Sequence, residues 1–178
     1  KQAAVRGVDS GGMLCSYKEL GLATVSDGIA ILPETATIGQ SFAEFGGYDD
    51  VTFELKVTAN RADCLSHYGL AREVACLLGR ELKKNSLFET DSKISTQDQF
   101  AVQVQESVLC PRYTGRLLKG VKVGPSPLWL QKRLEAVGMN SINNIVDVTN
   151  YVMLELGQPL HAFDASQIRG SKIIVAKS

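Results

Sequence analysis

Apolar residues recur at intervals of three and four in three segments of the chain, the pattern of helices that bury one face. The apolar positions are Leu70, Val74, Leu77 and Leu78 in the first segment, Leu130, Leu134 and Val137 in the second, and Ile145, Val148, Val152, Met153 and Leu156 in the third. Each segment is followed by a glycine, Gly79, Gly138 or Gly157, which can end a helix in a left-handed conformation. The pattern predicts three helices that end near these glycines.

Polar residues indicate how the helices begin. Ser126 and Pro127 fit the N-cap and the first helical position of the second helix. Asp147 lies in the first turn of the third helix, where the helix dipole favours a negative charge. Nearer the N-terminus, Ser16 precedes Glu19 by three residues, which is the spacing of a capping box around a short helical turn.

Alternation of apolar and polar residues predicts strands. In 51–57 ("VTFELKV") every second residue is apolar, as in a half-buried strand. Further strand-like runs occupy 28–33, 100–105, 113–123 and 172–176. Two short runs around "DSGG" (9–12) predict a hairpin that turns at these residues.

Together the patterns divide the chain into zones. Residues 1–50, with short strands and glycine-rich turns, are typical of part of a small β-barrel. Residues 51–84 hold a strand and a helix, and the polar segment 85–99 is typical of a linker. Residues 100–178 mix helices and strands, as in an α+β or α/β domain. For the whole chain we predict the α+β class, with a partial barrel followed by a mixed α/β unit.

Charge and composition exclude some classes of function. The 178 residues allow one domain or two small ones. The 19 basic and 19 acidic residues give zero net charge, which argues against a nucleic-acid binder driven mainly by phosphate attraction. No signal peptide opens the chain, and no apolar run approaches the roughly 18 residues that span a membrane. Because it begins at Lys1 rather than Met, we expect it to be a piece of a longer protein.

The cysteines give no sign of a disulfide framework or a metal site. Their positions are Cys15, Cys64, Cys76 and Cys110, without a C-x-x-C pair or a metal-like spacing to either histidine. We therefore expect the reduced, mostly buried thiols of a cytoplasmic protein, and no bound metal.

The usual nucleophile, zinc-protease, P-loop and dinucleotide motifs are absent, and one polar constellation remains. Thr149 and Asn150 lie in the third predicted helix, and His161 follows just beyond its end. A hydroxyl and an imidazole placed there could bind a carbonyl group or orient a water molecule. Spacing alone favours structural roles instead: His161 could bond to a helix terminus, Thr149 could bond back to its own helix, and Asn150 could be solvated. Similarly, we expect His67 to be an exposed helix residue, and Lys132 and Arg133 to lie on a solvated face.

Four stretches resemble the β subunits of bacterial phenylalanyl-tRNA synthetases, in the order found in that family. They are "VRGVDSGGMLCSYKELGL", "CPRYTGR", "SPLWLQKRLEAVG" and "INNIVDVTNYVMLELGQPLHAFD". The resemblance implies that 1–50 is the C-terminal part of an OB-fold tRNA-binding-type domain. It also implies that 51–84 is the second half of the N-terminal domain, that 85–99 is a linker, and that 100–178 is the first half of the B3/B4 editing domain.

The same resemblance implies a role for the polar constellation. The threonine and asparagine of V-T-N and the histidine of Q-P-x-H-A-F-D line the family's editing pocket, and they match Thr149, Asn150 and His161. This pocket hydrolyses mischarged tyrosyl-tRNA(Phe), and no residue is assigned here as the general base. Asn140-Ser141 stands where Arg-Pro is frequent in the family, and Ala59 and Ala62 stand where prolines are common.

Partners and cofactors are also implied by the resemblance. The whole enzyme would attach phenylalanine to tRNA(Phe) as an α2β2 heterotetramer, using ATP and Mg²⁺ on the α subunit, with no cofactor bound by this fragment and no membrane partner. The fragment alone would be inactive. Two alternatives remain: a structural or RNA-binding scaffold module, and a freestanding trans-editing deacylase.

Overall fold

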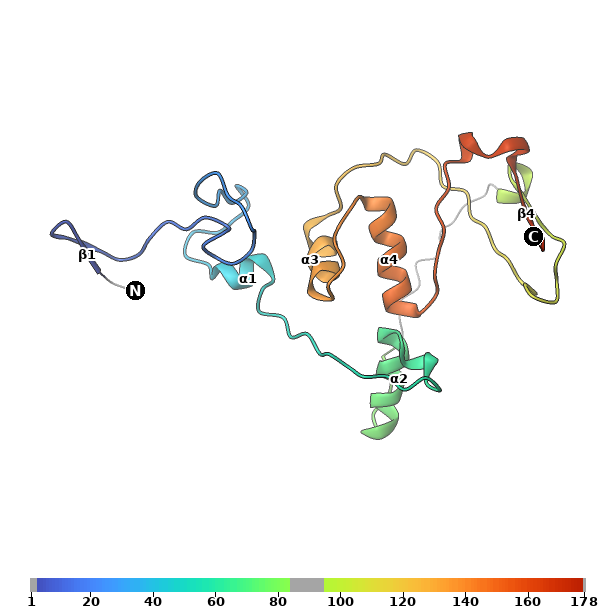
Figure 1. Cartoon of the computed structure of the whole chain (residues 1–178), viewed down its shortest axis with the longest axis horizontal. Helices are drawn as coiled ribbons and strands as arrows, with labels where there is room; N and C mark the ends of the chain where they lie inside the picture. The colour runs from blue at the N-terminus through green and yellow to red at the C-terminus, as the bar shows by residue number, and fades with distance from the viewer. Residues whose placement is uncertain (1–2, 84–94, 178) are drawn as a thin grey trace. The chain divides into compact units, whose positions relative to one another are not determined.

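The structure, a computed structural model, describes residues 3–83 and 95–177 and has the mixed helix and strand content of the α+β class. The chain forms two compact units, Lys1–Asp50 and Val51–Ser178. Figure 1 shows the first unit in blue and cyan and the second from green to red.

The first unit begins with an antiparallel hairpin of β1 (Ala3–Val5) and β2 (Val8–Ser10). Its two-residue turn is Arg6 and Gly7, which both have positive φ (54° and 80°), as in the turns that match the twist of a hairpin. The turn predicted at 9–12 is therefore wrong. Because Ala3 pairs with Ser10, the Asp-Ser part of that sequence belongs to a strand.

After the hairpin, the unit is mostly irregular. The predicted capping box is confirmed, because the Ser16 amide donates to the Glu19 carboxylate (2.8 Å) and the Glu19 amide donates to the Ser16 hydroxyl (3.2 Å). A short helix, α1 (Phe42–Gly46), closes the unit. The strand predicted at 28–33 is not formed, and within residues 3–50 the hairpin supplies both strands, so a barrel is not confirmed.

The second unit contains the three predicted helices, which are α2 (His67–Leu77), α3 (Leu128–Ala136) and α4 (Asn144–Leu156). Gly79, Gly138 and Gly157 have φ of 59°, 81° and 78°, so each helix ends at the expected glycine. The unit also contains short 3-10 turns at Ala62–Cys64, Thr96–Asp98, Ala165–Gln167 and Arg169–Ser171.

A small parallel sheet pairs β3 (Ala101–Val104) with β4 (Lys172–Val175), in the register Ala101 to Lys172. The strands expected near 100–105 and 172–176 are thus confirmed. Those expected at 51–57 and 113–123 are not formed, because neither segment has a neighbouring strand among the described residues to complete a hydrogen-bond ladder. Phe53 consequently remains 77% exposed.

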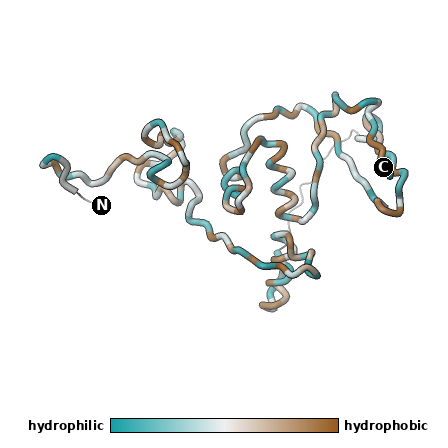
Figure 2. The backbone as a smooth tube through the Cα atoms, in the orientation of Figure 1, coloured by the Kyte–Doolittle hydropathy of each residue, from teal (hydrophilic) through white to brown (hydrophobic). Residues whose placement is uncertain are grey.

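The core of the second unit lies between α3 and α4. Leu130 and Leu134 are almost fully buried, whereas Val137, expected on the same face, is 39% exposed. Figure 2 shows hydrophobic positions along α4 and also in the connections between elements. Many large apolar side chains of the described residues are therefore exposed to solvent.

The expectations for the linker and for the cysteines are confirmed only in part. The linker 85–99 lies largely outside the described residues, although its end forms the 3-10 turn Thr96–Asp98, capped by the Ser95 hydroxyl. All four cysteines are free thiols, but Cys64 alone is buried, so the expectation of mostly buried thiols is wrong. In the part of the chain that the structure describes, none of the helices has the length and apolar content needed to cross a bilayer.

Candidate functional site

Helix α4 carries two of the three candidate residues. Its N-terminus is fixed by Asn143, whose side-chain oxygen accepts hydrogen bonds from the amides of Ile145 and Val146, both at 3.0 Å. Its C-terminus is closed by Gly157, whose amide donates to the Met153 carbonyl at 2.8 Å. In Figure 1 the chain then reverses direction beside the helix. Thr149 and Asn150 thus lie within a rigid element, and His161 follows it by a short turn.

The three candidate side chains differ in hydrogen bonding and in exposure to solvent. The Thr149 hydroxyl donates to the Val146 carbonyl of its own helix at 2.7 Å, which is the structural alternative weighed for this residue. Asn150 is half-buried. His161 is exposed, with its ring centroid 6.1 Å from that of Phe163. Within the described residues no hydrogen bond joins the three, so their convergence on one pocket stays a prediction.

Two hollows of the second unit lie elsewhere. One, of about 700 Å³, is lined by 124–125, 140–143, Gln131 and Glu135, where α3 connects to α4. The other, of about 440 Å³, lies between α2, residues 80–83 and Glu155 near the end of α4. Neither hollow is lined by Thr149, Asn150 or His161.

Asp147 is buried beside the candidate residues and has a larger role than its position in the helix predicted. Its carboxylate accepts hydrogen bonds from the Ser126 hydroxyl, from the Ser141 hydroxyl at 2.6 Å and from the Ile142 amide at 2.9 Å. Burial alone would raise the pKa of Asp147, but the two hydroxyls and the backbone amides that donate to it outweigh burial and hold the pKa below its usual value. The carboxylate thereby joins the start of α3, the α3–α4 connection and the first turn of α4.

The bond to Asp147 explains why the predicted N-cap of α3 is wrong. Pro127 occupies the cap position, and its carbonyl accepts from the Leu130 amide at 3.0 Å. The Ser126 hydroxyl is turned to the buried carboxylate instead. An acidic residue between Val146 and Val148 was the available signal in the sequence for a buried carboxylate.

A second contact between α3 and α4 uses Arg133, which is exposed to solvent as expected. Arg133 donates to the Tyr151 hydroxyl at 2.7 Å, and its guanidinium lies 5.6 Å from the centroid of the Trp129 ring. The Trp129 and Tyr151 rings meet edge to face at 5.6 Å. Arg133 thus holds the two helices together, while Lys132 forms an ion pair with Glu135 at 2.9 Å.

An ion cluster braces the loop before α2. Arg61 forms ion pairs with Asp63 at 2.9 Å and with Glu73 of α2 at 2.6 Å. Hydrogen bonding to Arg61 lowers the pKa of Asp63 to about 2 and also lowers that of Glu73. Burial raises the pKa of the neighbouring Cys64 thiol, which keeps it protonated and unreactive. The cluster therefore fixes the loop on its helix.

Comparison with known proteins shows what the chain is similar to. The B3/4 domain family matches residues 109–178, which include all three candidate residues. Phenylalanine–tRNA ligase beta subunits match the whole chain, with 71% identity in Bdellovibrio bacteriovorus and 51% in Geobacter metallireducens. That of Fusobacterium nucleatum is 48% identical over 99% of the chain. The chain spans 22% of the length of each of these relatives. Over its whole length, the chain is therefore similar to a segment of phenylalanine–tRNA ligase beta subunits.

Proposed function

We propose that this chain is part of a β subunit of phenylalanine–tRNA ligase, and that its second unit contributes to the hydrolysis of mischarged tyrosyl-tRNA(Phe). One observation carries the proposal: the B3/4 match covers the segment with the V-T-N and Q-P-L-H-A-F-D sequences, within a chain that is related to these subunits throughout. The enzyme itself attaches phenylalanine to tRNA(Phe).

Hydrolytic editing answers a problem of selectivity. A pocket that accepts phenylalanine through apolar contacts cannot strongly reject an amino acid that merely adds a hydroxyl group. A second site that binds this hydroxyl can select the mischarged product. Water then attacks the carbonyl of the aminoacyl ester, and the tRNA hydroxyl leaves with a proton.

Thr149, Asn150 and His161 form the part of the editing pocket that lies in this chain. The Thr149 hydroxyl donates its proton within α4, so its oxygen remains able to accept a hydrogen bond from substrate or water. His161 is exposed and can reach a bound ester. Thr149 and His161 orient the substrate or water and stabilise the developing oxyanion, which is a sufficient contribution without a general base.

The remaining assignments follow from the same relationship. Residues 1–50 are part of an OB-fold, and the β subunit pairs with an α subunit in an α2β2 heterotetramer in the cytoplasm. ATP and Mg²⁺ serve the synthetic reaction on the α subunit. Among the described residues of this chain, no group of three or more His, Cys, Asp or Glu side chains is placed to hold a metal ion.

Comparison of two charged tRNAs tests the proposal. We expect the intact heterotetramer to release tyrosine from tyrosyl-tRNA(Phe) much faster than it releases phenylalanine from phenylalanyl-tRNA(Phe). Replacing Thr149 with Val, which keeps the side-chain shape and removes the hydroxyl, should slow tyrosine release. Equal rates for the two charged tRNAs would contradict an editing role and favour a scaffold.

A further inference from the structure

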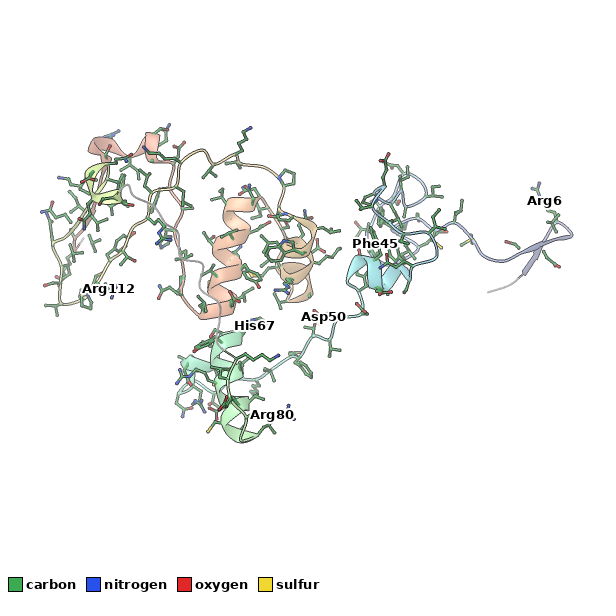
Figure 3. All side chains as sticks on the ribbon, turned by 180° about the vertical axis from the view of Figure 1, so that it is seen from behind. Arg6, Phe45, Asp50, His67, Arg80 and Arg112 are labelled. Carbon is green, nitrogen blue, oxygen red and sulfur yellow. The ribbon has the colours of Figure 1, made fainter. Side chains whose placement is uncertain are left out.

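The first turn of α2 meets the last turn of α4. The Nδ1 atom of His67 lies 3.1 Å from the carbonyl oxygen of Leu154. Ser66 lies against the turn that ends α4, because a Cβ atom added to Gly157 would lie 3.3 Å from the Cβ of Ser66. Figure 3 shows His67 at the end of α2 that faces α4.

The hydrogen bond has a defined direction and a structural consequence. A carbonyl oxygen can only accept, so Nδ1 of His67 is the donor. The last carbonyls of a helix have no partner within the helix and need one from outside. His67 supplies that partner to Leu154, one residue after the Met153 carbonyl that Gly157 satisfies. Two donors therefore close the last turn of α4.

The turn that carries Ser66 and His67 is itself held firmly. The Ser66 hydroxyl caps α2 by accepting from the Gly69 amide at 3.1 Å. A Cβ atom at Gly69 would collide with the carbonyl oxygen of Asp63, so the loop packs directly on the helix backbone. The Arg61 ion pairs then join this loop to Glu73, farther along α2. The segment from which His67 contacts α4 is therefore itself held by hydrogen bonds and ion pairs.

The segment fixed by this contact leads directly to His161. Gly157 is held in the left-handed conformation (φ 78°), and three residues separate it from His161. One of them is Pro159, whose ring restricts the path of the chain. A change in the last turn of α4 would therefore be passed on to the position of His161.

We propose that Ser66 and His67 are positioning residues for the editing reaction, which hold the end of α4 and so place His161 against the substrate. This inference rests on the proposed function. It assigns a role to the "NRADCLSH" stretch, 60–67, which lies far from the editing residues in the sequence.

Three variants of the intact heterotetramer test the inference. His67→Phe keeps an aromatic ring and removes the donor, whereas His67→Asn keeps an amide N–H near the position of Nδ1. Arg72→Ala is the control, since Arg72 is an exposed residue of the same helix. For each variant, steady-state release of tyrosine from tyrosyl-tRNA(Phe) and hydrogen exchange at the hydrogen-bonded amides of Leu156 and Gly157, in the last turn of α4, are measured.

We expect His67→Phe to lower kcat for tyrosine release about tenfold, because misplacing a group that acts on the ester slows hydrolysis of the bound substrate. KM should change less than about twofold. Exchange at both amides should accelerate, and His67→Asn should restore both properties. Arg72→Ala should resemble the unmodified enzyme.

Two results would overturn the inference. One is unchanged exchange at these amides in His67→Phe, and the other is faster exchange with an unchanged kcat. Failure of the unmodified enzyme to release tyrosine would instead overturn the proposed function, and the exchange measurement would still report whether His67 holds the segment.

Discussion

At Asp147 a carboxylate is removed from water and surrounded by hydroxyl and amide donors rather than by a basic side chain. Such a group is stable only while its hydrogen bonds are complete. The sequence alone predicted the place of Asp147 in a helix, but it could not predict its partners. Ser126 lies 21 positions away and precedes a proline, a context that favours a helix cap. Tertiary packing, rather than the local sequence, determines that Ser126 binds Asp147 instead of capping α3.

Replacing Asp147 with Asn should lower the free energy of unfolding by at least about 2 kcal/mol at pH 7, because at least one donor then faces an amide NH2 group instead of an oxygen. Urea unfolding of the purified variant and parent measures the difference. As a matched control, Ser141→Ala removes one donor and keeps the carboxylate, and should cost only about 1 kcal/mol. A variant as stable as the parent would show that Asp147 is not an anchor.

The same residue predicts an acid dependence. The folded pKa of Asp147 is depressed, so its contribution to stability is complete above the unfolded pKa of about 4 and is lost as the pH falls through the lower folded pKa. We therefore expect part of the loss of stability below pH 4 to disappear in Asp147→Asn. Unfolding measured between pH 2 and 7 tests this. Parallel pH profiles for parent and variant would contradict it.

At the scale of elements, the three predicted helices are present, whereas three of the predicted strands, at 28–33, 51–57 and 113–123, are not formed. Three- and four-residue spacing and a terminal glycine are local signals, and they located α2, α3 and α4 correctly. A strand also needs a neighbour, which its own sequence does not identify. The segment 51–57 has the alternation of a strand but no pairing partner in the described part of the chain.

Two positions of α3 show how burial rather than residue type determines stability. Leu134 is fully buried and Val137 is 39% exposed. Leu134→Ala should cost about 2–5 kcal/mol through lost contacts and a cavity, and Val137→Ala less than about 1 kcal/mol. Urea midpoints of the two variants give the comparison. Equal losses would place Val137 in the core as well.

Substitutions at two glycines distinguish the cost of backbone strain from the cost of a packing clash. Gly138 and Gly157 both have φ near 80°, but an added Cβ meets nothing within 4 Å at Gly138 and meets Ser66 at Gly157. Gly138→Ala should cost about 1 kcal/mol from strain alone. Gly157→Ala should cost more, because Ser66 must also move. The ranking of the two unfolding free energies tests the contact, and the reverse order would exclude it.

At the scale of the whole molecule, the balance of charge limits nucleic-acid binding. With 19 basic and 19 acidic residues, the chain has little general attraction for phosphate. We expect the 178-residue chain to bind tRNA(Phe) weakly and to lose binding steeply as salt rises. A filter-binding titration between about 50 and 200 mM salt measures this. Tight binding that persists above physiological salt would reveal a specific interface that the charge count does not predict.

The site was predictable only in part, for reasons at the same scale. The sequence stretch around His161 identified the candidate residues through resemblance, whereas spacing alone favoured structural roles for them. The described residues supply one helix and one turn of the proposed pocket, and no hydrogen bond joins the three candidate side chains there. The contact of His67 with α4 was not predictable, because it joins positions 87 residues apart.

The most direct test of the account is the effect of His161→Ala on two activities of the intact heterotetramer. Tyrosine release from tyrosyl-tRNA(Phe) and charging of tRNA(Phe) with phenylalanine are measured on the same preparation. We predict that tyrosine release loses about 2–4 kcal/mol of transition-state stabilisation, as when one group that stabilises an oxyanion is removed. Charging should be nearly unchanged, because the synthetic site is placed on the α subunit. Full tyrosine release by the variant, or equal loss of both activities, would contradict the role assigned to His161.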